Sequence, residues 1–206
     1  MIEFKTEPFP HQLAEFNENK DREAWGLLWE PGVGKTWPVL NEAAYLESEG
    51  KISGLMVIAP NGVHRNWIVD QVPAHLPEEL MERTRLFIYR TAKSKTKWHQ
   101  AEAQAVLDDP GFSIVAMSYD SLKTEKGKAF WKAYLSSRKC MYALDESPRI
   151  KTPGSKISKR IVGSSVAAPY RRILTGTIVA NSPFDVYNQI RFLDPKAWHE
   201  VGCSDF

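Results

Sequence analysis

The sequence predicts an α/β fold in which a mostly parallel sheet carries helices on both faces. Short apolar runs alternate with longer amphipathic stretches, and the short runs are almost continuously apolar, as strands buried on both faces should be. Alternation at this spacing is typical of a parallel sheet. The expected strands are residues 24–29, 54–59, 84–89, 112–117, 140–144 and 171–174. The expected helices are residues 36–49, 63–75, 97–108, 119–137, 155–163 and 183–193, with a loop around Gly127 (residues 123–128) as an alternative within the fourth.

The composition indicates one intracellular domain of ordinary size. The chain has 206 residues, 43% of them hydrophobic, and no Pro-, Gly- or Ser-rich linker divides it, so we expect a single domain over residues 1–206. It shows neither an apolar run of about 18 residues nor an apolar signal segment at its start. Two lone cysteines, Cys140 and Cys203, form no disulfide framework and fit the reducing cytoplasm, or the nucleus of a eukaryote. The net charge of +2 is too small to indicate nucleic-acid binding by itself.

A glycine-rich segment follows the first expected strand and opens the first expected helix. Gly32 and Gly34 let the backbone approach a polyphosphate closely, and the amides at the helix start point toward the anion. Lys35 can then reach the β- and γ-phosphates of ATP, and the Thr36 hydroxyl can coordinate Mg²⁺. Trp29 stands where kinases and small GTPases have glycine, which favours a loop centred on G-x-G-K-T. The predicted ATP-binding residues of this phosphate loop are Pro31, Gly32, Val33, Gly34, Lys35 and Thr36, and the alternative is a plain glycine-rich turn.

An acidic pair, Asp145 and Glu146, follows the apolar strand expected at residues 140–144. A carboxylate at that strand end can hold Mg²⁺ opposite Thr36, so Asp145 is the second predicted metal ligand. Glu146 can polarise the attacking water as a general base, which favours hydrolysis of ATP over transfer to a small acceptor. With Lys35 the pair forms the predicted catalytic set, although adjacent acids are often merely solvated on protein surfaces.

The last expected strand ends at Leu174 and is followed by Thr175, Gly176 and Thr177, which we call the T-G-T turn. Its two hydroxyls can couple the γ-phosphate site to neighbouring elements. The order of phosphate loop, acidic pair and T-G-T turn resembles helicase superfamily 2, and specifically the Snf2-like ATPases. The resemblance covers nearly the whole chain, because family motifs have counterparts at residues 9–12, 32–36, 58–61 with 66–67, 117–122, 145–151 and 174–181, and residues 192–195 fit the next stretch.

The resemblance implies a RecA-like P-loop NTPase fold and an ATP-driven motor that moves on nucleic acid, with duplex DNA favoured. It implies that Gln12 reads the adenine base, and that backbone contacts to DNA come from Pro60, Asn61, Arg65, Asn66 and Tyr119. The chain departs from the family pattern in the motif around the acidic pair, where Ser147 and Pro148 replace Ala-His. The replaced histidine couples ATP to the T-G-T turn in the family. Ile178 likewise replaces a proline.

Motors of this superfamily need a second RecA-like lobe, which closes over ATP and supplies arginine fingers. The chain contains no Gly-Arg pair of the kind expected in that lobe, so we expect the lobe to belong to a longer protein. Alone, these residues should bind nucleotide, hydrolyse it slowly and not translocate. The alternatives are another P-loop NTPase, such as a small-molecule kinase, and an ATP- or DNA-binding regulatory module without motor activity.

Three further features have plain structural interpretations. Trp67 is expected to pack its helix against the sheet, and the lysines at positions 93, 95 and 97 are expected to lie in a solvated loop. The five histidines have no metal-ligand spacing, so Mg²⁺ is the only metal predicted.

Overall fold

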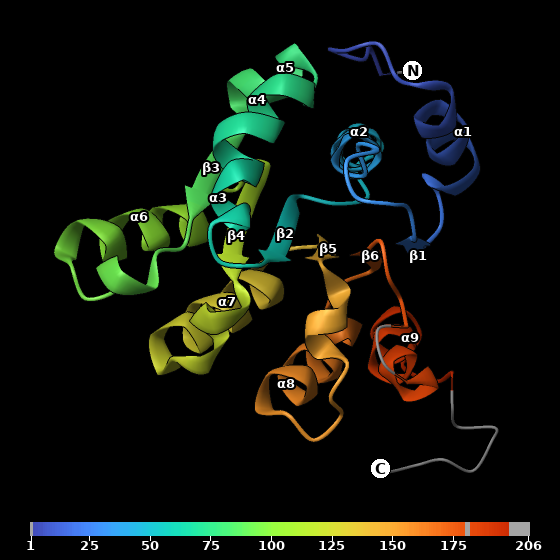
Figure 1. Cartoon of the computed structure of the whole chain (residues 1–206). Coiled ribbons are helices and arrows are strands. Elements are labelled where there is room, and N and C mark those ends of the chain that lie inside the picture. Colours follow the sequence, from blue (N-terminus) through green and yellow to red (C-terminus); the bar gives the residue numbers. More distant parts are fainter. Residues whose placement is uncertain (1, 180–181, 198–206) are drawn as a thin grey trace.

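Six parallel strands form one sheet within residues 2–179 and 182–197, the part of the chain that the computed structural model describes (Figure 1). They are β1 (Ala24–Leu27), β2 (Gly54–Ala59), β3 (Arg85–Ile88), β4 (Ser113–Ser118), β5 (Cys140–Asp145) and β6 (Tyr170–Leu174). Their order is β1-β6-β5-β2-β4-β3, and every neighbouring pair runs parallel. The predicted parallel sheet is confirmed. Residues 180–181, the end of the family motif expected at residues 174–181, and Cys203 lie outside the described residues.

Each strand lies where an apolar run predicts it. All residues of β2 and β4 are buried, which explains why these runs are continuously apolar rather than alternating. β1 is shorter than predicted, because its neighbour β6 ends at Leu174, directly opposite Leu27, and the chain beyond has no ladder partner. Leu28 is accordingly exposed.

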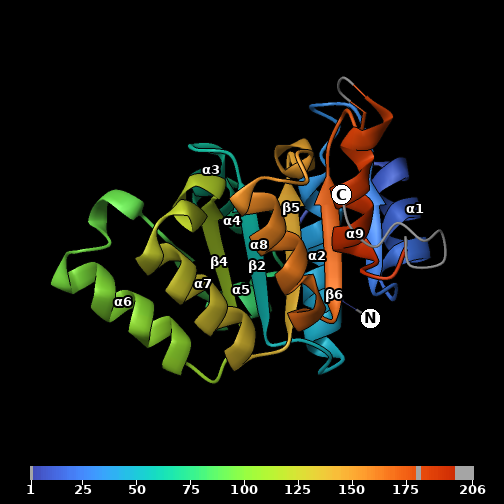
Figure 2. The ribbon, with the colours of Figure 1, turned by 90° about the horizontal axis from the view of Figure 1, so that it is seen from below.

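Helices cover both faces of the sheet (Figures 1 and 2). They are α1 (Pro10–Asn19), α2 (Thr36–Ser48), α3 (Val63–Asn66), α4 (Val72–His75), α5 (Glu78–Arg83), α6 (Lys97–Asp108), α7 (Glu125–Ser137), α8 (Lys156–Ser164) and α9 (Tyr187–Leu193). α2 and the run from α3 to α5 lie on one face, and α7, α8 and α9 lie on the other, with α1 packed on α2 and α6 beside α7. A separate apolar cluster fills each side. Among the described residues, no helix has the length and hydropathy needed to cross a membrane.

The helix predicted for residues 63–75 is continuous but contains a π-helical segment at Trp67–Gln71. Pro73 has no amide proton to donate to the preceding turn. The amide of Val72 instead donates to the carbonyl of Trp67, one residue further back than in an α-helix. The Trp67 side chain is 1% exposed, and the prediction that it packs against the sheet is confirmed.

The helix predicted for residues 119–137 is interrupted at Thr124, but the alternative of a loop around Gly127 is wrong, because residues 125–128 belong to α7. A 3-10 turn, Tyr119–Lys123, precedes α7, and the Thr124 hydroxyl begins α7 by accepting a hydrogen bond from the Gly127 amide at 3.1 Å. A Cβ on Gly127 would collide with the carbonyl of Ser121, so only glycine fits there. The sequence does not predict α1 and α5, because each buries too few apolar side chains to give a clear helical periodicity.

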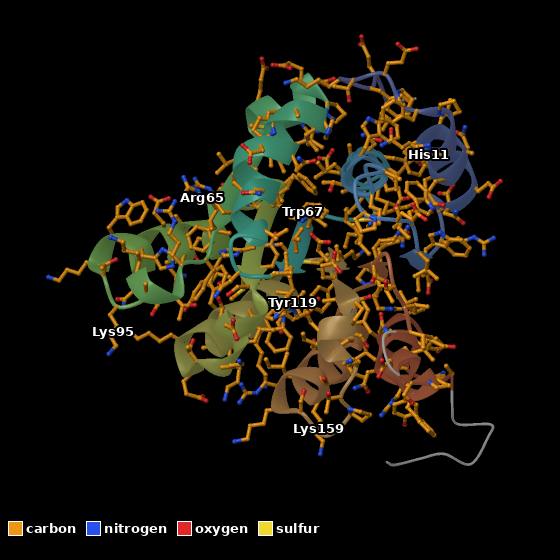
Figure 3. All side chains as sticks on the ribbon, in the orientation of Figure 1. His11, Arg65, Trp67, Lys95, Tyr119 and Lys159 are labelled. Carbon is orange, nitrogen blue, oxygen red and sulfur yellow. The ribbon has the colours of Figure 1, made fainter. Side chains whose placement is uncertain are left out.

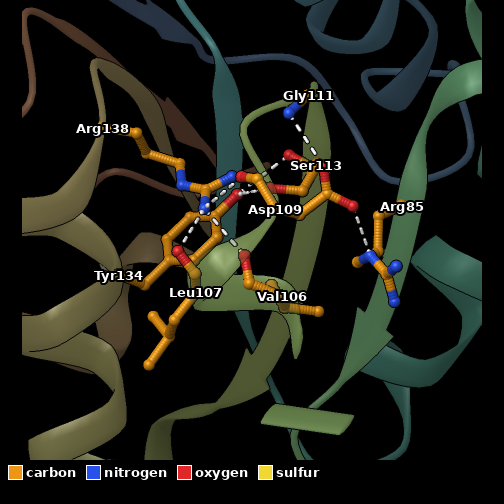
Figure 4. A network of polar contacts seen from close by, with 8 residues as sticks. All are labelled: Arg85, Val106, Leu107, Asp109, Gly111, Ser113, Tyr134 and Arg138. Carbon is orange, nitrogen blue, oxygen red and sulfur yellow. Dashed lines mark hydrogen bonds and ion pairs between the residues drawn. The ribbon is translucent and has the colours of Figure 1, made fainter. Parts of the chain in front are cut away.

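A polar network holds the amino-terminal edge of the sheet together (Figure 4). Arg138, just before β5, donates to the Ser113 hydroxyl at 2.5 Å. The same guanidinium donates to three carbonyl oxygens at and just after the end of α6, at 2.7, 3.3 and 3.2 Å. It therefore caps that helix and ties it to β4 and β5. Arg85 at the start of β3 pairs with Asp109 at 2.5 Å, but both side chains are partly solvated.

We predict that Arg138→Ala lowers the free energy of unfolding by about 2–3 kcal/mol, because several carbonyl groups lose a charged donor at a half-buried site. Arg85→Ala is the matched control and should cost less than about 1 kcal/mol, since it removes a surface ion pair. Urea unfolding followed by circular dichroism measures both. Equal losses in the two variants would contradict this role for Arg138.

Candidate functional site

The strand order brings the predicted site together at the carboxyl edge of the sheet. β1, β6 and β5 are neighbours, so the phosphate loop, the T-G-T turn and the acidic pair follow adjacent strands. β2, β4 and β3 form the other half of the sheet, and the predicted DNA contacts follow β2 and β4. The two halves meet between β5 and β2. Ligand sites of open parallel sheets lie at this edge.

The phosphate loop has the backbone conformation that its glycines permit. Gly32 and Gly34 have φ values of 84° and 78°, in the left-handed region. α2 begins at Thr36, so its first amides face the loop. A Cβ on Gly32 would meet no atom within 4 Å, which leaves room for a ligand against the backbone. A Cβ on Gly34 would instead strike the amide nitrogen of Gln12.

The Lys35 side chain bonds back to the two residues that precede the phosphate loop. Its ammonium donates to the carbonyl oxygens of Trp29 at 2.9 Å and Glu30 at 3.0 Å. A bound phosphate would compete with these two carbonyls for the same charge, and a charged hydrogen bond to phosphate is the stronger of the two kinds.

The first turn of α1 is bonded to the phosphate loop. The Gln12 side chain donates to the Gly34 carbonyl at 2.9 Å and accepts from the Phe9 amide at 2.9 Å. His11 bonds through its ring to the Val33 carbonyl at 3.0 Å. The His11 ring also stacks on Phe9 and packs edge-on against Trp29, with centroids 5.8 and 5.0 Å apart. Trp29, the residue that departs from the common loop pattern, therefore contacts α1 through the His11 ring.

Asp145 accepts hydrogen bonds through both its side chain and its backbone. One carboxylate oxygen accepts from the indole N–H of Trp67 at 2.8 Å, and its carbonyl accepts from the Tyr119 hydroxyl at 2.9 Å. Burial raises the pKa of Asp145, while the Trp67 hydrogen bond and the charge of Lys35 act to lower it. Glu146 turns away into solvent with φ of 54°, the only non-glycine residue in the left-handed region among those described.

The T-G-T turn packs on the phosphate loop. The Thr175 hydroxyl accepts from the Thr177 amide at 3.0 Å and fixes the turn, and Thr175 itself is 1% exposed. A Cβ on Gly176 would come within 2.8 Å of the Pro31 ring, so the absence of a side chain allows this close approach. The T-G-T turn and the phosphate loop are therefore in direct contact.

Four of the five residues expected at the nucleic-acid surface lie at the carboxyl end of β2. Pro60 is half-buried, and Asn61, Arg65 and Asn66 are exposed. Tyr119 differs: it is 3% exposed and its hydroxyl is used by Asp145, so the expected surface position does not agree with the structure. The 3-10 turn Tyr119–Lys123, which follows β4, directs the Tyr119 ring into the core. Figure 3 shows Trp67 and Tyr119 near the middle of the molecule and Arg65 at its flank.

Sequence reasoning missed two contributors to the site. Arg90, two residues beyond the end of β3, lines a pocket beside Asn61 and His64, and it could have been noticed as a basic residue close to a strand end. Burial lowers the pKa of His64, which keeps its ring neutral there. The contact of Trp67 with Asp145 was also missed, although a buried tryptophan N–H generally requires a partner.

The side chains present fit ATP with Mg²⁺. Gly32 offers the open backbone that a polyphosphate needs, and Lys35 offers the charge. Thr36 and Asp145 would supply one hydroxyl and one carboxylate, which are hard oxygen ligands few enough to leave positions for water and phosphate, as Mg²⁺ prefers. No cluster of three or more acidic, histidine or cysteine side chains suited to a metal occurs among the described residues.

The comparisons with known proteins agree with this architecture. The model of the family described as SNF2-related domain matches residues 13–206. The chain belongs to the SNF2-related domain family. Chromodomain-helicase-DNA-binding protein 1-like of Danio rerio is 27% identical over 180 residues, which cover 86% of this chain and 16% of that protein. Transcription regulatory protein SNF2 of Saccharomyces cerevisiae is 26% identical over 203 residues, covering 90% of this chain and 11% of that protein.

A solved structure confirms the RecA-like fold. The Sulfolobus solfataricus SWI2/SNF2 ATPase core, in complex with dsDNA, matches with a TM-score of 0.69 and 23% identity over 94% of this chain and 37% of that one. This SNF2-related domain therefore spans only a small part of the length of the curated relatives given above.

We predict that Trp67→Phe lowers the free energy of unfolding by about 1–3 kcal/mol, because a buried carboxylate oxygen loses its donor while an aromatic ring is kept. Trp98→Phe, at a residue 60% exposed, should change it by less than about 0.5 kcal/mol. Combining Trp67→Phe with Asp145→Ala, which removes the acceptor oxygens, in urea-unfolding measurements should give a coupling of about 0.5–3 kcal/mol. Strict additivity of the two changes would show that the contact contributes nothing.

Proposed function

We propose that this SNF2-related domain binds Mg·ATP at the carboxyl ends of β1, β6 and β5 and, together with a second RecA-like lobe, hydrolyses it to move along DNA. The observation that supports this proposal is that the phosphate loop, the T-G-T turn and the acidic pair follow the three neighbouring strands β1, β6 and β5, with the charge of Lys35 acting to lower the pKa of Asp145. Because ATP and DNA are the proposed partners, we place the domain in the cytoplasm or the nucleus.

The phosphate loop holds the triphosphate in this proposal. Its amides and the Lys35 ammonium neutralise the β- and γ-phosphates, which requires Lys35 to leave the carbonyls of Trp29 and Glu30. Thr36 and Asp145 hold Mg²⁺, which neutralises charge on the phosphates when it is bound. Trp67 keeps the Asp145 carboxylate oriented, since one of its oxygens is already fixed by the indole.

Glu146 acts as the general base for the attacking water. It is exposed and follows the strand in a left-handed turn, so its carboxylate is free of the fixed hydrogen bonds that restrict Asp145. A carboxylate beside a bound γ-phosphate can take the proton that the water loses.

Gln12 reads the adenine base. Its amide group already donates once and accepts once within the protein, which leaves one donor and one acceptor position. That remaining pair complements the N7 acceptor and the N6 donor of adenine. Because Gln12 donates a hydrogen bond to Gly34, the residue that reads the base is connected directly to the phosphate loop.

DNA contacts come from residues after β2, which are the half-buried Pro60 and the exposed Asn61, Arg65 and Asn66. Contacts to phosphates from such groups are salt-dependent and largely independent of sequence. Duplex DNA is favoured because the structural neighbour is in complex with dsDNA and a relative is named as a DNA-binding helicase. Tyr119 takes part indirectly, through its hydrogen bond to Asp145.

We predict that Lys35→Ala weakens binding of Mg·ATP by about tenfold to 150-fold, the equivalent of a lost charged hydrogen bond of about 1.5–3 kcal/mol. Lys95→Ala, far from the loop (Figure 3), is the control and should leave the affinity unchanged. Isothermal titration calorimetry measures both dissociation constants. Unchanged nucleotide affinity in Lys35→Ala would overturn the proposed site.

We also predict that the 206 residues alone hydrolyse ATP slowly, and that a longer chain carrying the second lobe is faster by about 10³–10⁵, the contribution of an arginine finger. Duplex DNA should stimulate only the longer form, and Arg65→Ala should reduce this stimulation. Steady-state ATPase assays with duplex and single-stranded DNA test the prediction. Nucleotide binding without stimulation in either form would favour a regulatory binding module instead.

A further inference from the structure

A buried hydrogen bond joins the segment after the acidic pair to helix α9. The Ser147 hydroxyl donates to the side-chain oxygen of Gln189 at 2.5 Å, and both residues are 0% exposed. The two residues are 42 positions apart in the sequence. Ser147 stands where the family pattern has a different residue, next to the missing histidine.

The other end of the Gln189 amide binds the segment that leaves the T-G-T turn. Its nitrogen donates to the Ile178 carbonyl at 2.8 Å and to the Asp185 carbonyl at 2.9 Å. The neighbouring Asn188 donates to the Ile150 carbonyl at 2.8 Å, which adds a second bond to the segment after the acidic pair. We call Ser147, Ile178, Asn188 and Gln189 the α9 brace.

The α9 brace connects Glu146 to the T-G-T turn through contacts that do not include Asp145. Ser147 follows Glu146 directly, and Ile178 follows the T-G-T turn directly. The turn packs through Gly176 on Pro31 of the phosphate loop. A displacement of the loop by a γ-phosphate can therefore reach Glu146 through Ile178, Gln189 and Ser147.

Buried polar pairs of this kind are rigid because each partner lacks any other way to satisfy its hydrogen bonds. Glu146 itself has a left-handed backbone, a conformation that a non-glycine residue keeps only when its surroundings hold it. The residue that follows it, Ser147, is the one that the brace fixes.

We propose that Gln189 is a positioning residue for ATP hydrolysis: through Ser147 and Ile178 it holds Glu146 in register with the T-G-T turn. This inference rests on the proposed function. The brace takes the place of the histidine-based coupling that the family pattern would otherwise place at Pro148. It acts on the hydrolysis step, and it leaves the affinity for Mg·ATP unaltered.

The test uses the 206-residue chain with Ser147→Ala, Gln189→Met, the two combined, and Gln104→Met as a control at an exposed glutamine of α6. Gln189→Met keeps the side-chain length and removes both polar groups. The combined variant leaves neither side chain of the Ser147–Gln189 bond unsatisfied, although the Ile178 and Asp185 carbonyls lose their donor in it as they do in Gln189→Met. Ser147→Ala leaves those two bonds in place and keeps the test valid if the Gln189 variants unfold. Single-turnover hydrolysis with protein in excess over Mg·ATP gives the rate, and calorimetry gives the affinity.

We expect each single variant to hydrolyse at least about tenfold more slowly with an affinity changed by less than about twofold, and the combined variant to be no slower than the singles, because one link is removed in all three. Ser147→Thr, which keeps the hydroxyl, should retain most of the wild-type hydrolysis rate that Ser147→Ala loses. A wild-type rate in the combined variant, or a loss of rate that follows a loss of affinity, would overturn the inference.

Amide hydrogen exchange provides a second readout that needs no turnover. In the wild type, Mg with a non-hydrolysable ATP analogue should slow exchange across Tyr187–Leu193 more than Mg·ADP does, and the combined variant should lose the difference. Identical exchange with both nucleotides in the wild type would reject the brace as a coupling element. Failure of the wild type to bind either nucleotide would reject the proposed function itself, which separates the two outcomes.

Discussion

The carboxylate of Asp145 is the point at which the two halves of the sheet edge meet. Asp145 ends β5, the strand that borders the nucleotide half. Its carboxylate accepts a hydrogen bond from the Trp67 indole and its backbone carbonyl accepts one from the Tyr119 hydroxyl, and both donors lie in the half that carries the proposed DNA contacts. Burial makes the charge of this carboxylate costly, and the Trp67 hydrogen bond and the charge of Lys35 offset part of that cost. A shift of the Trp67 segment would therefore act on this carboxylate directly.

The parallel sheet separates stability from function along the strands. At the amino-terminal edge, Arg138 binds the end of α6 and the start of β4, and nothing proposed for ATP or DNA depends on it. At the carboxyl edge, the groups that matter are glycines with positive φ, a strained Glu146 and a lysine held only by carbonyls. One edge can therefore stay rigid while the other rearranges around a ligand.

Much of this arrangement could be predicted from the sequence, and the remainder has physical reasons. The strands of the sheet, the phosphate loop and the acidic pair are local patterns, in which a few neighbouring residues determine both the conformation and the chemistry. Trp67 with Asp145, and Ser147 with Gln189, are contacts over 78 and 42 positions, which no local pattern contains. The inward position of Tyr119 depends on a 3-10 turn that composition does not indicate. α1 and α5 lack the apolar stripe that would reveal them.

The central claim is that one triphosphate site lies at the carboxyl ends of β1, β6 and β5, next to a fixed Asp145. A crystal structure of the 206 residues with Mg²⁺ and a non-hydrolysable ATP analogue tests it most directly. The account predicts that the Lys35 ammonium moves from the carbonyls of Trp29 and Glu30 to phosphate oxygens, while the Trp67 indole stays bonded to Asp145. A nucleotide bound elsewhere, or a Lys35 that keeps both carbonyls with the nucleotide in place, would contradict it.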